Sequence, residues 1–321
     1  MPSPPHPVPY QGSKRKLAAA ILAHVPAGTR RLIEPCCGSA ALSLAALHAG
    51  RVERVHLGDS FAPLVRLWDE IIAAPERVAR AYARLWRDQL AEPRAAYDRV
   101  RARFNRDGDP ARLLYLLARC VKSAVRFNAA GEFNQSPDRR RLGTHPDRMR
   151  AGLVGTAALL RGRATTAAAD YAVALAAAEP GDVVYLDPPY EGTSGGRDPR
   201  YHQGLDRARL IAELTRLRAR GVAVIVSLDG RCGDRRYGAA LPAELGLCHV
   251  ELPAGRSTQA TLHGGRAETV ESLYVSPALA ALAAGGCARP TAGVQGDRRG
   301  QGDRRRDRDP RGVRLAGADR P

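Results

Sequence analysis

The segment Val183-Val-Tyr-Leu-Asp-Pro-Pro-Tyr190 decides the fold of this chain. Its four leading apolar residues predict a short buried strand. Asp187 follows that strand directly, at the place where open α/β sheets bind their ligands. Pro188 and Pro189 restrict the backbone and remove two N–H donors, so the turn presents the Asp187 carboxylate and the Pro188 carbonyl as acceptors. The competing interpretation is an ordinary proline turn with a capping aspartate.

These groups suit a nucleobase. Two acceptors can bind both hydrogens of an exocyclic amino group, and the ring of Tyr190 can stack on a base. We therefore take Asp187, Pro188 and Tyr190 as candidate catalytic residues.

Short apolar runs alternate with helical patterns on both sides of this segment, as in α/β proteins with a parallel sheet. The apolar runs predict strands over residues 31–34, 52–57, 183–186, 222–228 and 270–275. A helix is predicted over residues 40–49, closed by Gly50. Another begins after Asp206, which can cap it, and ends at Gly221.

A helical segment interrupts this alternation. Apolar residues recur at helical spacing between positions 63 and 160, although residues 126–150 are rich in Arg, Asn and Gly and are predicted as loop. Residues 289–321 hold ten Arg and five Asp, with almost nothing to bury. We predict a sheet domain of residues 1–62 and 161–278, a helical insertion of residues 63–160, and a disordered basic tail of residues 285–321.

The composition narrows the class of protein. The 321 residues are 44% hydrophobic, and 50 Lys and Arg against 33 Asp and Glu give a net charge of +17. This charge suggests a polyanionic partner such as nucleic acid, although an Arg-rich composition by itself is the simpler explanation. No apolar stretch approaches the roughly 20 residues of a membrane helix, and residues 1–9 do not resemble a signal peptide. The six cysteines form no C-x-x-C pair and the histidines show no metal spacing, so we expect a cytoplasmic protein without metal.

Two further segments carry candidate ligand-binding residues. Glu34-Pro-Cys-Cys-Gly-Ser-Ala-Ala41 reads as a strand end, a glycine turn and a helix start, a pattern typical of nucleotide-type sites. About twenty residues on, Asp59 ends the next predicted strand, where an acidic residue can bind ribose hydroxyls or cap the following helix. Pro9-Tyr-Gln-Gly-Ser-Lys-Arg-Lys-Leu17 contains two of the three lysines of the chain. Lys14 could reach a carboxylate and Tyr10 could pack on a ring, or the segment is only a turn before a helix.

Together and in this order, these segments resemble the Dam-like class of DNA adenine N6-methyltransferases. The resemblance runs from Tyr10 to about Ser276. It implies a Rossmann-like methyltransferase sheet with a helical DNA-recognition insertion, and S-adenosylmethionine as methyl donor without a metal. The cofactor-binding residues that it implies are Tyr10, Gly12, Lys14, Glu34, Gly38, Asp59, Asp170 and Asp187.

The segment from Arg126 to Asn134 is similar to the target-recognition loop of that class. The candidate DNA-binding residues are Arg126, Asn128, Asn134, Arg139 and Arg140. Asn can pair with adenine and Arg with guanine in the major groove, whereas phosphate contact is the simpler role for residues 139–141. The implied partner is double-stranded DNA, and a cognate restriction endonuclease can accompany such a protein.

The sequence departs from that class at two positions of the glycine turn. Cys36 stands where an aromatic residue is usual, and Ala40 stands where a second glycine is usual, without glycine's freedom at positive φ. These departures motivate the alternative of a DNA-binding relative without catalysis. A methyltransferase acting on RNA or on a protein amide is the other alternative, and Asp rather than Asn at position 187 speaks against the amide.

Overall fold

The computed structural model describes residues 3–189, 205–232, 235–236, 239–256 and 268–285. Residues 1–287 form one compact unit, which contains both the sheet and the helical insertion. Tyr190 and the predicted basic tail lie outside the described residues, apart from the tail's first position, Gly285, which ends the last helix.

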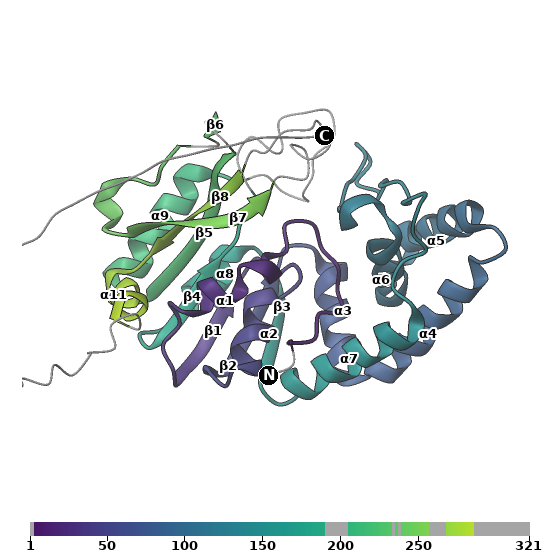
Figure 1. Ribbon diagram of the computed structural model, residues 1–321, viewed down its shortest axis with the longest axis horizontal. Coiled ribbons are helices and arrows are strands. Elements are labelled where there is room, and N and C mark those ends of the chain that lie inside the picture. Colours follow the sequence, from purple (N-terminus) through teal and green to yellow (C-terminus); the bar gives the residue numbers. More distant parts are fainter. Residues whose placement is uncertain (1–2, 190–204, 233–234, 237–238, 257–267, 286–321) are drawn as a thin grey trace, which may run out of the picture. The chain divides into compact units, whose positions relative to one another are not determined.

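The sheet has the strand order β3-β2-β1-β4-β5-β8-β7, with the short β6 paired to β5 (Figure 1). The five strands from β3 to β5 run parallel, and β8 and β7 are antiparallel to their neighbours. The chain moves from β1 to β2 and β3 on one side and then returns to β4 on the other side of β1, so the strand order reverses between β1 and β4. The predicted α/β fold with a Rossmann-like sheet is confirmed. The strands are β1 (Thr29–Glu34), β2 (Val52–Asp59), β3 (Ala164–Ala168), β4 (Asp182–Leu186), β5 (Ala223–Cys232), β6 (Arg235–Arg236), β7 (Cys248–Arg256) and β8 (Glu268–Val275).

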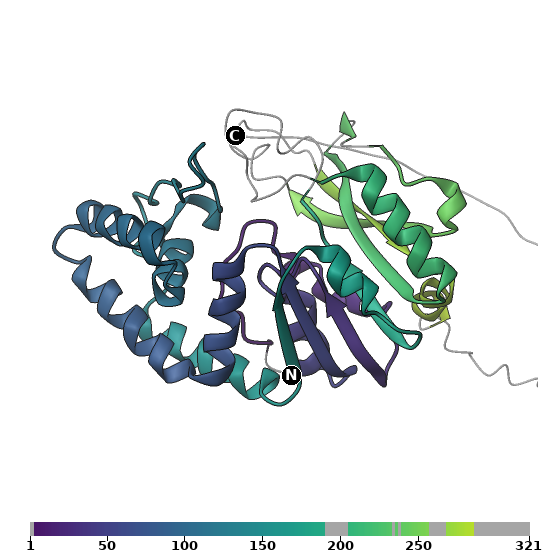
Figure 2. The ribbon, with the colours of Figure 1, turned by 180° about the vertical axis from the view of Figure 1, so that it is seen from behind.

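Helices cover both faces of the sheet (Figures 1 and 2). One apolar core joins the sheet to α1 (Ala18–Leu22), α2 (Ala41–His48) and α11 (Pro277–Gly285), and it includes Leu17, which directly follows the 3₁₀ helix η1 (Lys14–Lys16). The other core packs α8 (Tyr171–Ala176) and α9 (Arg207–Ala219) against the opposite face, beside the 3₁₀ helix η3 (Ala243–Leu245). Asp206 caps α9 as predicted, because its carboxylate accepts a hydrogen bond from the Arg209 N–H at 3.1 Å.

The insertion is the connection between β2 and β3. It consists of α3 (Ala62–Ala73), α4 (Pro75–Asp88), α5 (Pro93–Asp107), α6 (Pro110–Arg119), the 3₁₀ turn η2 (Val121–Ser123) and α7 (Pro146–Leu160). A proline stands in the first turn of each of its five α-helices, where the missing N–H costs nothing. The predicted loop over residues 126–150 ends earlier than expected, because Pro146 begins α7.

Side chains from the helices fix the loop between η2 and α7. The Asn105 amide pairs with the backbone of Phe133 in both directions, at 2.9 and 3.0 Å. The Tyr97 hydroxyl donates to the Gln135 carbonyl at 2.8 Å. An isolated bridge between Phe127 and Phe133 closes the loop into a short hairpin. The candidate recognition segment is therefore held by side chains of α5 in addition to its own hydrogen bonds.

The N-terminal segment crosses the insertion before it reaches the sheet. Its prolines lie against two glycines of α7: a Cβ at Gly152 would lie 3.4 Å from Pro7 Cβ, and a Cβ at Gly155 would lie 3.5 Å from Pro5 Cβ. We call residues 3–10 the N-terminal strap. Val8 within it is buried.

Three strands were not predicted: the two-residue β6, and the longer β3 and β7. β3 is short and built of Ala and Thr, so it lacks an apolar run. β7 contains Pro253 and Gly255, which argue against a strand in a sequence pattern. Both strands lie at sheet edges, where such residues are tolerated, and β7 has an irregular register between Pro253 and Gly255. Among the described residues, we find no helix with the length and apolarity needed to cross a membrane.

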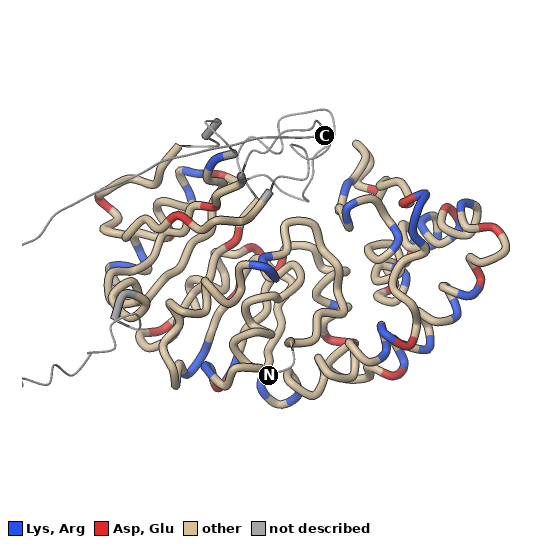
Figure 3. The backbone as a smooth tube through the Cα atoms, in the orientation of Figure 1, with Lys and Arg blue, Asp and Glu red and all other residues tan. Residues whose placement is uncertain are grey.

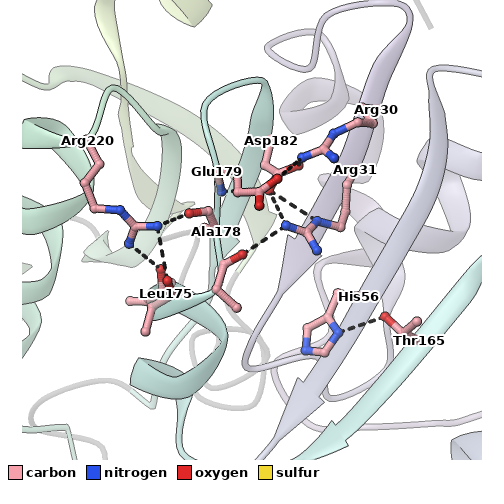
Figure 4. Close-up of polar contacts among 11 residues, drawn as sticks. Arg30, Arg31, His56, Thr165, Leu175, Ala178, Glu179, Asp182 and Arg220 are labelled. Carbon is pink, nitrogen blue, oxygen red and sulfur yellow. Dashed lines mark hydrogen bonds and ion pairs between the residues drawn. The ribbon is translucent and has the colours of Figure 1, made fainter.

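A charged cluster ties β1 to β4 at the amino ends of these strands (Figure 4). The buried Asp182 accepts hydrogen bonds from Arg31 at 2.5 and 3.2 Å, from Arg30 at 3.1 Å and from the Glu179 N–H at 2.9 Å. Burial alone would raise the pKa of Asp182, but these hydrogen bonds and the two arginine charges lower it below its usual value. Arg220 of the segment before β5 donates to the carbonyls of Leu175, Ala176 and Ala178, at the end of α8 and just after it.

We predict that Asp182→Asn lowers the free energy of unfolding by about 2–3 kcal/mol near neutral pH, because buried charge-assisted hydrogen bonds are lost. A lowered pKa means that the Asp182 contribution is present above about pH 4 and is lost as pH falls through the folded pKa. Urea unfolding between pH 2.5 and 7 should show a smaller loss of stability at low pH in the variant. Glu179→Gln, at a side chain 63% exposed, is the control and should cost less than about 1 kcal/mol. Equal effects of the two substitutions would contradict this role for Asp182.

Candidate active site

A pocket opens at the carboxyl ends of β1, β2 and β4, where the strand order reverses. This is the place where doubly wound sheets bind ligands. All the sequence-predicted cofactor residues line it, together with Pro188. The lining residues are Tyr10, Gln11, Gly12, Ser13, Lys14, Glu34, Pro35, Cys36, Cys37, Gly38, Ser39, Ala41, Asp59, Ser60, Phe61, Val125, Asp170, Tyr171, Asp187, Pro188, Pro189, Leu205, Asp206 and Arg209.

The Lys14 ammonium stands against Asp187. Its Nζ lies 2.8 Å from Asp187 Oδ1 and 2.9 Å from Oδ2, and it donates to the Gly12 carbonyl at 3.2 Å. The Lys14 side chain is 4% exposed, so its charge depends on these partners. The prediction that Lys14 reaches a carboxylate is confirmed, and that carboxylate is the one at the end of β4.

Glu34 is fully buried between β1 and α2. It accepts hydrogen bonds from the N–H of Ser43, at 3.0 Å, and from the Ser43 hydroxyl. Burial raises the pKa of Glu34 to about 7, and the nearby charge of Asp187 adds to the rise. Ser43, in the first turn of α2, was not predicted as a site residue. Ser43 lies nine residues after Glu34, and this spacing predicts a contact between them only if residues 34–43 are already assigned to a strand, a turn and a helix.

The glycine turn is packed under Tyr10. Gly38 has φ +46°, and a Cβ at this position would lie 3.1 Å from Tyr10 Cδ1. Asp59 supports the turn, because its Oδ2 accepts from the Gly38 N–H at 3.1 Å and its Oδ1 accepts from the Phe61 N–H at 3.0 Å. The Asp59 carboxylate therefore shapes the loop after β2 as well as facing the pocket.

Ala40 and Cys36 are the two departures noted in the sequence. Ala40 has φ +50° and is fully buried, so the chain places an alanine in the left-handed region that favours glycine. Cys36 lines the pocket, and burial together with the charges of Asp59 and Asp187 raises the pKa of its thiol well above the usual value. The thiol is thus a neutral, weakly polar part of the wall.

Asp170 occupies the far wall with partners that the sequence did not indicate. Its carboxylate caps α8 through the Ala172 N–H at 2.9 Å and pairs with Arg209 at 2.7 and 3.0 Å. The Arg209 guanidinium lies 5.2 Å from the centre of the Tyr171 ring. No local motif marks Arg209, which is one of many arginines in the chain.

The candidate DNA-binding residues lie outside this pocket, on the insertion. Arg139 and Arg140 are exposed, as is Asn128, and Arg126 and Asn134 are half-buried. The Asn128 side chain braces the hairpin, because it accepts from the N–H groups of residues 130 and 132 and donates to the Glu132 carboxylate. The insertion meets the pocket through Val125 and through the Ser123 carbonyl, which accepts from the Gln11 N–H at 2.9 Å. Within the part of the chain that the structure describes, no three His, Cys, Asp or Glu side chains are grouped as metal ligands.

A reversing parallel sheet, a glycine turn before a helix and an acid-rich pocket at that point define a Rossmann-like methyltransferase fold. The family of D12 class N6 adenine-specific DNA methyltransferases has a model that matches residues 10–209, and the chain belongs to this family. The resemblance read from the sequence is thereby confirmed.

Three relatives are similar to the chain over more than half of its length. A DNA N-6-adenine-methyltransferase of Escherichia phage P1 is 28% identical over 69% of this chain and 29% of its own length. The retron Ec67 DNA adenine methylase of Escherichia coli is 28% identical over 68% of this chain and 75% of its own length. A DNA adenine methylase of Serratia marcescens is 30% identical over 56% of this chain and 65% of its own length. The match thus spans less than a third of the phage protein and about two thirds or more of the other two.

We predict that Glu34→Gln removes a pH dependence of stability. A folded pKa of about 7 against an ordinary value of 4.5 means that the folded state holds the proton more tightly. The wild-type protein should therefore lose stability as pH rises from about 4.5 through 7, and the variant should not. Urea unfolding at pH 5, 6, 7 and 8 measures the difference. Glu53→Gln, at an exposed position of β2, is the control. A wild-type profile in the Glu34 variant would show that this carboxyl ionises normally.

Proposed function

We propose that the protein transfers the methyl group of S-adenosylmethionine to N6 of adenine in double-stranded DNA, with the target base flipped out of the duplex. The observation that carries the proposal is Asp187 at the end of β4, held by Lys14 at 2.8 and 2.9 Å beside the backbone of Pro188. This arrangement presents a fixed anionic acceptor at the rim of the pocket.

The residues of the pocket fit the cofactor. The carboxylates of Asp59, Asp170, Asp187 and Asp206 outnumber the cations of Lys14 and Arg209, which suits a ligand with a sulfonium charge. Gly38 leaves the space over the turn to the Tyr10 ring and a ligand, since a Cβ would fill it. Asp59 at the end of β2 is placed for ribose hydroxyls. When bound, S-adenosylmethionine supplies an electrophilic methyl group.

The protein's own task is to orient the attacking nitrogen. A carboxylate has about four lone-pair sites, and Lys14 occupies one on each oxygen of Asp187. The Asp187 carboxylate and the Pro188 carbonyl together can accept both hydrogens of an adenine amino group. Such contacts favour a tetrahedral nitrogen whose lone pair is free to attack, and positioning supplies most of the acceleration. Tyr190, outside the described residues, is proposed to stack on the flipped base.

The insertion is proposed to hold the DNA. Residues 63–160 contain 19 basic and 11 acidic residues, a net charge of +8. Figure 3 shows Lys and Arg distributed along its helices and loop. Arg139 and Arg140 are exposed and suit phosphate contact, and the hairpin with Arg126, Asn128 and Asn134 is proposed for base contact. A DNA substrate and free cysteines at the pocket agree with a cytoplasmic protein, and a companion restriction endonuclease remains part of the proposal.

The test of the proposal is transfer of labelled methyl from S-adenosylmethionine to unmethylated duplex DNA, with nucleoside analysis of the product. We expect N6-methyladenine, and RNA of the same sequence should receive little label. Label in RNA alone would favour the RNA alternative. Cofactor and DNA binding without any transfer would favour a relative without catalysis.

We predict that Asp187→Ala lowers the rate of methyl transfer at least about 10³-fold, because the acceptor that orients the amino group is lost. DNA affinity should persist, as the insertion is unchanged. Single-turnover methylation and fluorescence anisotropy measure the two effects. Asp88→Ala, at an exposed position of α4, is the control. Near-wild-type turnover of the Asp187 variant would remove this residue from the mechanism.

We predict that Gly38→Ala weakens S-adenosylmethionine binding by about tenfold or more, since the added methyl displaces the Tyr10 ring from the pocket wall. Gly50→Ala is the matched control. It has φ +63° and shares the backbone cost of about 1–2 kcal/mol, but a Cβ there meets nothing within 4 Å. Isothermal titration calorimetry should separate the two variants. The same affinity in both would mean that Tyr10 does not shape the cofactor site.

A further inference from the structure

Three carboxylates approach one face of the sheet at its ligand-binding edge, and one ammonium lies among them. Glu34 ends β1 and Asp187 follows β4. Glu271 belongs to β8, on the far side of β5. Lys14 Nζ lies 2.8 Å from Asp187 Oδ1 and 3.6 Å from Glu271 Oε2. Lys14 is thus shared by the end of β4 and by a strand that is not its neighbour.

The register of β8 explains why Glu271 reaches this place. Glu271 pairs with Asp229 of β5 and with Leu252 of β7. Leu273 and Val275 pack in the same core as Tyr185, Ile21 of α1 and Leu17, which directly follows η1, while Tyr274 packs in the core on the opposite face. Alternation along a strand therefore directs Glu271 to the face that carries Lys14.

The two carboxylates hold Lys14 in different ways. An ammonium has three N–H donors, and the two oxygens of Asp187 and the Gly12 carbonyl lie within hydrogen-bond distance of it. Glu271 at 3.6 Å is an ion pair beyond hydrogen-bond length. Glu271 therefore acts on Lys14 chiefly through its charge, and its side chain is only 20% exposed, so solvent screens that charge weakly.

A lone ammonium beside Asp187 would neutralise it one for one and weaken it as a hydrogen-bond acceptor. We propose that Glu271 is a positioning residue that acts on Asp187 through Lys14. The Glu271 carboxylate shares the Lys14 charge, so that Asp187 is held in place yet keeps net negative charge for the amino group of the target base. Among the described residues, the other titratable groups near this cluster are Glu34, the Cys36 thiol and the Tyr185 hydroxyl, which donates to Ser227 at 3.1 Å.

The first experiment does not depend on methyl transfer. The chain has only three lysines, Lys14, Lys16 and Lys122, and the latter two are exposed. In protein labelled with ¹⁵N-lysine, Glu271→Gln should shift the Lys14 Nζ resonance while those of Lys16 and Lys122 stay unchanged. Three unchanged resonances would show that the Glu271 charge does not act on Lys14 and would overturn the proposal.

The second experiment rests on the proposed function and uses steady-state methylation of duplex DNA. Glu271→Gln should lower kcat about tenfold with little change in the affinities for DNA and S-adenosylmethionine. Glu271→Asp, which keeps the charge, should recover most of kcat. Glu251→Gln on the exposed side of β7 is the matched control and should leave kcat unchanged.

The outcomes separate the two proposals. A wild-type enzyme that methylates no nucleic acid refutes the proposed function and leaves the NMR result standing. A Glu271→Gln variant with wild-type kcat, or an Asp variant as slow as the Gln variant, overturns the role of Glu271 while methylation by the wild type stands. If Glu271→Gln weakened only the binding of DNA or S-adenosylmethionine and left kcat unchanged, Glu271 would not act on the amino group of the target base.

Discussion

The ion pair between Lys14 and Asp187 is the constraint on which the site depends. It joins residues 173 positions apart and is nearly closed to solvent on the lysine side. A buried ammonium is costly without partners, so the N-terminal segment must dock on the end of β4 whenever the chain is folded. This docking places the Tyr10 ring over Gly38 and brings the N-terminal turn to the mouth of the pocket. Folding of the N-terminus and assembly of the site are therefore one event.

Non-glycine residues with strained, positive φ angles lie near the same pocket. Among the described residues, only Ala40, Lys122 and Ser123 have positive φ without being glycine. Ala40 directly precedes α2, between the pocket-lining residues Ser39 and Ala41, and the Ser123 carbonyl accepts a hydrogen bond from the N–H of the pocket-lining Gln11. Such conformations cost of order 1–3 kcal/mol each and persist where the surroundings impose them. The strained positions coincide with the junction of sheet, insertion and N-terminal segment.

Much of the fold could be predicted because buried parallel strands leave continuous apolar runs, as in residues 183–186. The edge strands β3 and β7 could not, since Ala, Thr, Pro and Gly are tolerated at an edge and carry no apolar signal. At the site, Lys14, Gly38, Asp59 and Asp187 stood out by motif. Ser43, Tyr171 and Arg209 did not, because they act through tertiary contacts that no local pattern encodes. The hairpin likewise depends on Asn105, about 20 to 30 positions before it.

The N-terminal strap has a consequence for recombination between relatives. The insertion begins and ends at adjacent strands, which would allow a recognition module to be exchanged as a cassette. The N-terminal strap prevents exchange of the insertion alone, because Pro5 and Pro7 pack against Gly155 and Gly152 of α7. A chimera that inherits a foreign α7 with larger side chains at these two positions would displace the segment that carries Lys14. Viable exchanges must therefore transfer two separate stretches of the gene, the one that encodes the N-terminal strap and the one that encodes the insertion.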